Sequence, residues 1–324
     1  MKAILFNRPG APDVLYYGDA PIPAPAPGEL LVRVRATALN RADLLQRSGG
    51  YPPPSGASSI LGLEIAGDVV ESAEGFRAGD RVMGVVTGGG YAQYATIPAG
   101  MAIPIPEGWT FEAAAAIPEA FLTAHLNLFT LGQLHPGETV LIHAGGSGIG
   151  TAAIQLAKAA GGRVFVTAGS DEKRALCRSL GADETIDYKT ESFAQRVAEL
   201  TDKRGVDVIL DFVGAPYWDA NLSSLAVGGR LLLIGFLGGA VGQLNLGSIL
   251  PKSLTITGTT LRRTPLTQKV ALTQDFITRF YDRLVDGTLK PVIDQVVPLQ
   301  EAASAHRRMH ENRNAGKIVL RIED

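Results

Sequence analysis

The pattern of apolar and polar positions divides the chain into segments of different character. Up to about residue 120, short apolar runs are separated by glycine and proline. Residues 29–36 are typical, because Val32, Val34 and Ala36 fall on one face and Leu31 with two arginines on the other. This alternation predicts a half-solvated strand. Further strands are expected at 2–6, 66–70 and 81–86, and together they predict a small barrel.

From residue 139 onward, apolar strands alternate regularly with helices. We expect strands at 139–143, 163–167, 184–187, 206–212, 229–235 and 254–259, and helices at 148–160, 171–180, 190–201, 216–226 and about 244–251. Six strands that alternate with helices predict a doubly wound parallel sheet. Two helices before it, at 111–117 and 120–129, are expected to form a domain crossing. The last segment predicts helices at 267–286 and 300–312 and strands near 292–297 and 317–322.

A glycine-rich turn stands at the start of this regular region. The apolar run 139–142 is followed by four glycines within the eight residues 143–150, and an alanine-rich helix follows. Residues without a Cβ allow backbone N–H groups and a helix N-terminus to approach a pyrophosphate. The turn therefore predicts a dinucleotide-binding site, with contacts from Ala144, Ser147, Gly148, Ile149 and Gly150.

Length and composition exclude several classes of protein. A chain of 324 residues predicts two domains. The net charge of -2 gives no reason to expect nucleic acid or an anionic membrane as a partner. The one cysteine, Cys177, allows neither an intrachain disulfide nor a cysteine-built zinc site. No apolar run has the length of a signal peptide or a membrane span, so we expect a cytoplasmic protein.

Longer motifs identify a family. The chain contains ALNRAD at 38–43, LGLEIAG at 61–67, GGGYAQY at 88–94, AAAIPEAFLTA at 114–124, VLIHAGGSGIGTAAIQLAKA at 140–159 and GKIVL at 316–320. With these it resembles the medium-chain dehydrogenase/reductase superfamily, and within it the zinc-independent quinone oxidoreductases of the zeta-crystallin type. Ser147, the motif QR-x-G-x-Y at 46–51 and PPPSGAS at 52–58 resemble the tumour-suppressor-inducible branch.

The resemblance implies a fold and an assembly. A GroES-like domain of the β-barrel type is expected from residues 1–120 and 264–324. A Rossmann domain that binds NADPH, residues 121–263, is expected to be inserted between them. The family forms homodimers through sheet edges, and residues 254–260 are our candidate edge strand.

The positions that hold catalytic zinc in metal-dependent relatives carry Asn40, Leu63 and Glu119 here. An amide and an isobutyl group cannot replace a thiolate and an imidazole on Zn²⁺. We therefore expect no metal, and an acceptor that is already electrophilic, such as a quinone or an enone.

The second strand of the regular region predicts the cofactor. NAD-selective folds carry Asp or Glu at its end, where this chain has Ala168, Gly169 and Ser170. Small residues leave room for a 2′-phosphate, so NADPH is expected. Gly169 and Ser170 are candidate contacts, Lys173 could supply a charge, and Tyr188 matches a family position that lines the same phosphate.

The resemblance also assigns the nicotinamide end. Asn40 and Tyr51 match positions that face the nicotinamide and the substrate, and Tyr51 could donate a hydrogen bond or a proton. Thr123 resembles a nicotinamide contact, and Lys317 a basic residue near the cofactor. Loops at strand ends supply the remaining candidates, Val213, Gly214, Gly235, Phe236 and Leu237.

Three functions remain open. The first is NADPH-dependent reduction of quinones by hydride transfer without metal, by one or two electrons. The second is NADPH-dependent reduction of α,β-unsaturated carbonyls or enoyl thioesters. The third belongs to another class, a cofactor-binding structural or redox-sensor protein. The physiological substrate is not readable from the sequence.

Overall fold

The computed structural model describes residues 1–323, which form two compact units. The first unit combines Met1–Leu122 with the segment from Arg262 onward, and we call it the terminal unit. The second, the central unit, is Thr123–Leu261. Within residues 1–323, no helix combines the length and apolar character needed to cross a membrane.

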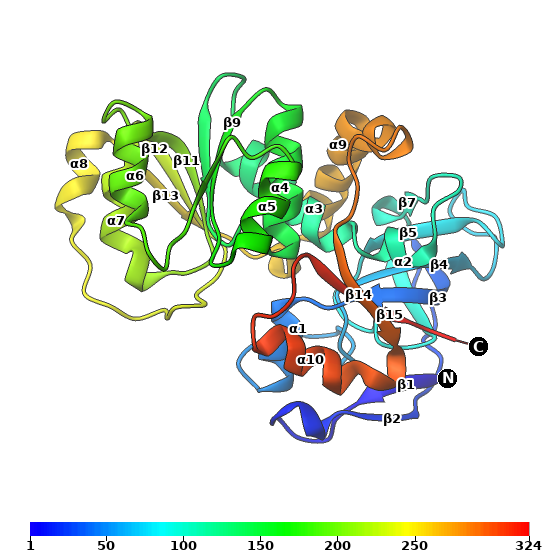
Figure 1. Cartoon of the computed structure of the whole chain (residues 1–324). Coiled ribbons are helices and arrows are strands. Elements are labelled where there is room, and N and C mark those ends of the chain that lie inside the picture. Colours follow the sequence, from blue (N-terminus) through cyan, green and yellow to red (C-terminus); the bar gives the residue numbers. More distant parts are fainter. Residues whose placement is uncertain (324) are drawn as a thin grey trace. The chain divides into compact units, whose positions relative to one another are not determined.

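A sheet built from both ends of the chain forms the frame of the terminal unit. Its strands run in the order β14-β15-β3-β4-β5-β7, and β6 pairs with β3. Their bounds are β3 Glu29–Ala38, β4 Glu64–Val69, β5 Arg81–Val85, β6 Tyr94–Pro98, β7 Ile103–Pro104, β14 Ile293–Pro298 and β15 Lys317–Arg321. β15 lies antiparallel to β3, with Leu320 opposite Thr37 (Figure 1). The N-terminal and C-terminal segments therefore share one sheet.

The remaining elements of the terminal unit are a two-stranded sheet and several helices. β1 (Lys2–Leu5) pairs with β2 (Tyr16–Asp19). The helices are α1 Arg41–Arg47, α2 Phe111–Ala115, α9 Leu266–Val285 and α10 Ala302–His310, and α3 (Pro118–His125) crosses the boundary between the units. Asn40 and Asp43 form a capping box at the start of α1, which satisfies backbone donors at both residues.

The central unit is a parallel sheet with helices between its strands. The order in the sheet is β10-β9-β8-β11-β12-β13, with all strands parallel. The strands after β8 are first added on one side of it and then, from β11 onward, on the other side, which is typical of a dinucleotide-binding fold. The strands are β8 Thr139–Ile142, β9 Arg163–Thr167, β10 Glu184–Ile186, β11 Val206–Asp211, β12 Leu225–Leu233 and β13 Thr255–Gly258. The helices are α4 Gly148–Ala159, α5 Asp171–Ser179, α6 Phe193–Leu200, α7 Trp218–Ser224 and α8 Ile249–Lys252.

Several elements differ from the sequence-based expectations. α3 begins at Pro118, two residues before the expected 120, because proline is well tolerated in a first turn. The expected α-helix 120–129 ends at His125 and continues as a π-helix over Leu126–Leu131. β12 begins four residues before the expected 229, at Leu225, because a register shift against β11 accommodates Gly228 within the strand.

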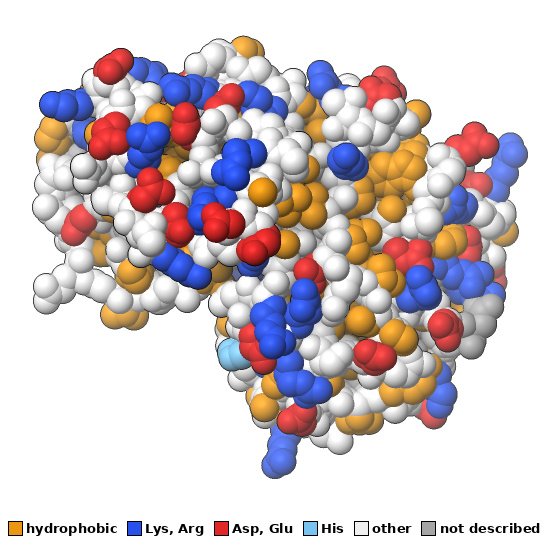
Figure 2. Space-filling view, viewed as in Figure 1, with side chains coloured by type: hydrophobic (Ala, Val, Ile, Leu, Met, Phe, Trp, Pro, Cys, Tyr) orange, Lys and Arg blue, Asp and Glu red, His pale blue; other side chains and the backbone are white. Residues whose placement is uncertain are grey.

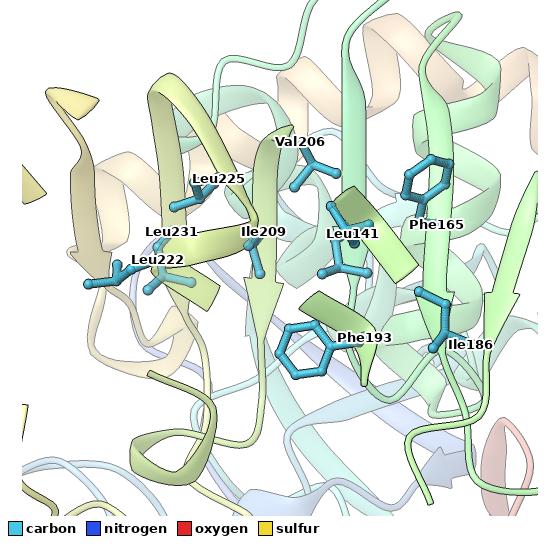
Figure 3. Packing of buried hydrophobic residues seen from close by; sticks show 10 residues of the cluster. Leu141, Phe165, Ile186, Phe193, Val206, Ile209, Leu222, Leu225 and Leu231 are labelled. Atoms are coloured by element: carbon cyan, nitrogen blue, oxygen red, sulfur yellow. The ribbon is translucent and has the colours of Figure 1, made fainter. Parts of the chain in front are cut away.

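The core of the central unit is formed by buried side chains of the sheet and of the helices that pack on it. Leu141, Phe165, Ile209 and Leu231 are 0% exposed, and Phe193 of α6 packs with them (Figure 3). On the visible surface of this unit, acidic and basic side chains are interspersed, in keeping with the small net charge (Figure 2).

Replacing Leu141 by alanine tests the role of this core. We expect Leu141→Ala to lower the free energy of unfolding by about 2–5 kcal/mol, because the side chain is fully buried and leaves a cavity. Leu250, which is 84% exposed in α8, provides the control, and Leu250→Ala should change stability by less than about 0.5 kcal/mol. Denaturant unfolding measures both variants, and equal losses would contradict this packing.

Candidate active site

A buried ion pair lies at the centre of the terminal unit. The Lys317 ammonium at the start of β15 donates to Glu64 Oε1 at 2.7 Å, to Asn40 Oδ1 at 2.7 Å and to the Leu39 carbonyl at 2.9 Å. Asn40 Nδ2 donates to the same Glu64 oxygen at 2.8 Å. Lys317 and Glu64 are almost fully buried. Each group thus has several charge-assisted partners, which a buried ion pair needs to offset its desolvation.

The polar network continues from Asn40 through the interior of the same unit. The Asn40 N–H donates to Asp43 Oδ2 at 2.8 Å, and the Tyr91 hydroxyl lies 3.2 Å from that oxygen. The Tyr91 hydroxyl also lies 3.3 Å from His306 Nε2, and His306 Nδ1 is 3.1 Å from Arg47. Burial raises the pKa of Asp43 to about 6 and lowers that of His306 to about 3. These groups connect α1, the loop before β6 and α10.

Glu119 on α3 is less well paired. Its backbone N–H donates to Glu64 Oε2 at 2.8 Å, but its own Oε2 is buried without a hydrogen-bond partner among residues 1–323. Burial, together with the neighbouring Glu64 carboxylate, raises the pKa of Glu119 to about 8. The Glu119 carboxyl is therefore mostly protonated at neutral pH, and a neutral acid is a potential hydrogen-bond donor.

The residues at the positions of catalytic zinc do not fit a zinc ion. Of the three positions, Asn40 is hydrogen-bonded to the Lys317 ammonium together with the neighbouring Glu64. Leu63 is a buried apolar side chain, and Glu119 supplies one carboxyl group. A thiolate and an imidazole are both lacking from this set. Within residues 1–323, no group of three His, Cys, Asp or Glu side chains has metal-binding geometry.

Tyr51 lies in the terminal unit against two arginines. Its ring centroid is 5.5 Å from the guanidinium carbon of Arg262 and 6.0 Å from that of Arg263. Sequence reasoning identified Tyr51 but neither arginine as a binding candidate, because the two segments are far apart along the chain. The phenol therefore belongs to a cationic environment.

The glycine turn of the central unit has the form expected of a pyrophosphate cradle. A Cβ on Gly150 would lie 2.5 Å from the Ala144 carbonyl oxygen, so the turn is too tight for a side chain there. Ser147 caps α4 by accepting the Gly150 N–H at 3.0 Å. The N–H groups of Gly148 and Ile149 belong to the first turn of α4 and have no carbonyl partner within the helix. They are available to a bound anion, so this turn fits a dinucleotide.

The candidate 2′-phosphate contacts gather near the carboxyl ends of β9 and β10. Ser170 caps α5 by accepting the Lys173 N–H at 3.3 Å, which fixes its hydroxyl at the start of that helix. A Cβ on Gly146 would lie 3.0 Å from Lys173 Cγ, so the lysine stem covers the glycine turn. A Cβ on Gly169 would lie 2.6 Å from the Tyr188 hydroxyl oxygen. The structure thus brings Gly169 and Tyr188 together.

Asp211 shapes the loop that follows β11. Its carboxylate accepts the N–H groups of Val213 at 2.7 Å and Gly214 at 3.2 Å, and the amide of Asn221 at 3.1 Å. Asn221 also binds buried His143 at 2.7 Å, next to the glycine turn. A Cβ on Gly214 would lie 2.8 Å from the Phe236 ring. The loops after β11 and β12, with Val213, Gly214 and Gly235, therefore lie together.

Phe236, Leu237 and Thr123 complete the predicted set in the central unit. Phe236 and Leu237 are 56% and 54% exposed, so their side chains lie on the surface of this unit and stay candidate cofactor contacts. Thr123 is 5% exposed, and its hydroxyl has no hydrogen-bond partner among residues 1–323. A buried hydroxyl without a partner is a potential ligand contact. Asn40, Tyr51 and Lys317 belong to the terminal unit, and all the other predicted site residues belong to the central unit.

Comparison with known proteins identifies the family. Residues 26–107 match the alcohol dehydrogenase GroES-like domain and residues 148–277 the zinc-binding dehydrogenase domain. A quinone oxidoreductase of Pseudomonas aeruginosa is 39% identical over 98% of this chain and 99% of its own. The chain belongs to the quinone oxidoreductase family of the medium-chain dehydrogenase/reductases.

Two further relatives of this family member are informative. The crystal structure of Escherichia coli quinone oxidoreductase complexed with NADPH has a TM-score of 0.88 and 31% identity, and covers 99% of this chain and 100% of that one. A mycocerosic acid synthase-like polyketide synthase of Mycolicibacterium smegmatis is 35% identical over 93% of this chain, which spans 14% of the synthase. The family thus includes both separate reductases and segments of larger synthases.

Replacing Glu119 by glutamine tests its protonation. Because the folded-state pKa is raised, folded and unfolded chains are both protonated below about pH 4.5, and stability is lost as the pH rises toward 8. A glutamine side chain at this position would stay neutral. We therefore expect Glu119→Gln to be about 1–3 kcal/mol more stable than the wild type at pH 8 and nearly equal to it at pH 5. Thermal unfolding at both pH values measures this.

The control is Glu107→Gln, which removes one exposed carboxylate from the same unit. Its effect should be small at both pH values. A Glu119→Gln effect that is the same at pH 5 and pH 8 would contradict a raised pKa.

Proposed function

We propose that this chain catalyses NADPH-dependent reduction of quinones by hydride transfer without a metal ion. The observation that carries the proposal is the closed set of Lys317, Glu64 and Asn40, in which Asn40, at one of the three positions that hold zinc in metal-dependent relatives, is already hydrogen-bonded to a lysine and a glutamate. These three side chains are hydrogen-bonded to one another, so they do not hold a Lewis acid that could polarise the substrate that accepts the hydride. A quinone is electron-poor and needs the least polarisation. The full-length similarity to a quinone oxidoreductase supports the same conclusion.

In this proposal the central unit holds NADPH. The N–H groups of Gly148 and Ile149 would bind the pyrophosphate, while Ser170, Lys173 and Tyr188 would bind the 2′-phosphate. When bound, the nicotinamide supplies the hydride. Asp211 keeps the loop of Val213 and Gly214 in place through its two backbone hydrogen bonds, so that loop is preorganised for the cofactor.

The terminal unit would orient the acceptor. Asn40 is held by Lys317, Glu64 and the Ala38 carbonyl, so its amide is rigid, and the second lone pair of its Oδ1 can hold a water. Tyr51, beside two guanidinium groups, can donate a hydrogen bond to a substrate oxygen as negative charge develops there. The proton for the reduced quinone would come from Tyr51 or from water.

A second candidate is reduction of an α,β-unsaturated carbonyl or enoyl thioester. The observation in its favour is the similarity to a segment of a polyketide synthase. In that reaction a proton must be transferred to a carbon atom, so Tyr51 would have a larger role than with quinones.

The third candidate, a cofactor-binding structural or redox-sensor protein, would bind NADPH without turnover.

Two finer points belong to the same proposal. We place the chain near the tumour-suppressor-inducible branch because of Ser147 and the motifs at 46–58. We also propose a homodimer through β13, which is an end strand of its sheet and pairs there with β12.

Replacing Lys173 by methionine tests the cofactor assignment. We expect the KM for NADPH to rise roughly 10–100-fold and the KM for NADH to change less than about 3-fold, because a charged hydrogen bond to the phosphate contributes about 1.5–3 kcal/mol. Lys203→Met, at an exposed lysine of the same unit, is the control. Equal increases for both cofactors would exclude Lys173 as a phosphate contact.

A substrate panel separates the proposed reactions. Loss of NADPH absorbance is followed with an ortho-quinone, a para-quinone and a 2-enoyl thioester, for the wild type and Tyr51→Phe. We expect quinones alone to be reduced rapidly, with less than about a 10-fold loss in Tyr51→Phe because water can supply the proton. Rapid thioester reduction that collapses in Tyr51→Phe would establish the second candidate, and binding without turnover the third.

A further inference from the structure

Arg262 is a buried cation whose outer nitrogens have no hydrogen-bond partner among residues 1–323. It lies in the short η6 turn (Leu261–Arg263) and is 5% exposed. Its Nε donates to the Thr87 carbonyl at 2.8 Å. Nη1 and Nη2 are both buried, and neither is hydrogen-bonded within this described range. Burial of charged donors without hydrogen bonds is unfavourable, so a hydrogen-bond partner from outside the chain would stabilise this arrangement.

One edge of the guanidinium, formed by its two outer nitrogens, has no hydrogen-bond partner among residues 1–323. The Tyr51 ring lies 5.5 Å from its central carbon, and Thr87 occupies Nε. A Cβ on Gly88 would lie 3.5 Å from Nη2 and 2.6 Å from the Ser58 carbonyl, so this part of the wall must remain backbone. The two Nη atoms form a planar fork, which matches the two oxygens of a carboxylate or sulfonate.

The neighbouring charges favour an anion over a neutral ligand. Lys269, on the first turn of α9, is 7% exposed. Burial lowers the pKa of Lys269; the nearby Glu119 opposes this shift, and the charge of Arg262 adds to it. The Asp43 carboxyl group is hydrogen-bonded to the backbone N–H groups of Asn40 and Gly62 and to the Tyr91 hydroxyl. Glu119, with its pKa raised to about 8, is mostly neutral at neutral pH. The charges of Asp43 and Glu119 partly offset that of Arg262, but within residues 1–323 neither carboxyl group is hydrogen-bonded to its outer nitrogens.

We propose that Arg262 binds an anionic group, a carboxylate or sulfonate, on the acceptor that this protein reduces. The identity of the ligand as the acceptor rests on the proposed function, whereas the anion site rests on the Arg262 fork itself. The substrate class is therefore an electrophilic carbonyl compound that carries a separate acidic group. Tyr51, stacked near the same guanidinium, would line the path between that group and the reducible carbonyl.

Binding without turnover gives the first test. Calorimetric titration compares 2-naphthoate with neutral 2-naphthylmethanol for the wild type, Arg262→Met, Arg262→Lys and Arg77→Met. We expect Arg262→Met to weaken naphthoate roughly 10–100-fold and the alcohol less than about 3-fold, because the charged hydrogen bonds are lost. Arg262→Lys should retain part of the affinity, since the charge remains without the fork. Arg77, an exposed arginine of the same unit that contacts neither Tyr51 nor Arg262 within the described residues, is the control, and its replacement should leave the affinity for both ligands unchanged.

Turnover gives the second test and separates the two proposals. The wild type and Arg262→Met are assayed with 1,2-naphthoquinone and with its 4-sulfonate. A rise in KM for the sulfonate alone supports the anion site. If the wild type reduces neither quinone but binds naphthoate through Arg262, the proposed function fails and the anion site stands. If both quinones are reduced and the Arg262 variant changes neither the sulfonate nor naphthoate, the anion site fails and the proposed function stands.

Two further outcomes would overturn the inference. One is that Arg262→Met raises the KM for NADPH and leaves the KM for both quinones unchanged, because the anion bound by Arg262 would then be a phosphate of the cofactor. The other is equal affinity of the wild type for naphthoate and naphthylmethanol. This last comparison needs no variant, so equal affinity would overturn the inference even if circular dichroism shows that Arg262→Met does not fold.

Discussion

The ion pair between Lys317 and Glu64 is the interaction on which the terminal unit depends. It joins β15, near the end of the chain, to β4, across 253 residues of sequence. The same ammonium holds Asn40 at the start of α1. Because both charges are buried, removal of either would leave the other uncompensated, a change that typically costs about 3–5 kcal/mol. The terminal unit therefore needs its C-terminal segment for charge balance as well as for sheet pairing.

The same ion pair explains why this member of a dehydrogenase family does not resemble a metal enzyme at this position. The Lys317 ammonium has three N–H donors, and these are already hydrogen-bonded to the Leu39 carbonyl, Asn40 Oδ1 and Glu64 Oε1. This ammonium stabilises the buried Glu64 carboxylate. Unlike a catalytic metal ion, it offers no open coordination position to a substrate. This arrangement is consistent with the proposed reduction of acceptors that are reactive without a Lewis acid.

The sequence was most informative where function requires a local pattern. The apolar run before Gly145, the cap at Ser147 and the alanine-rich helix are adjacent in sequence, so the strand, turn and helix could be predicted to within a residue or two. Lys317 was found only through a family resemblance, and its bond to Glu64 depends on sheet pairing between distant segments. Arg262 gave little signal, because a pair of adjacent arginines is typical of solvated turns. Its burial against Tyr51 is a tertiary property.

Buried charge has two different meanings within the terminal unit. Lys317, Glu64 and Asp43 each have two or more hydrogen-bond partners, so their desolvation is offset within the chain. Arg262 has one hydrogen-bond partner within residues 1–323 and two buried nitrogens without any. A fully satisfied network stabilises one structure, whereas an unsatisfied donor raises the free energy until a ligand arrives. The number of hydrogen-bond partners, rather than the sign of the charge, therefore distinguishes the buried groups that stabilise the fold from Arg262, the group that we propose binds an anion.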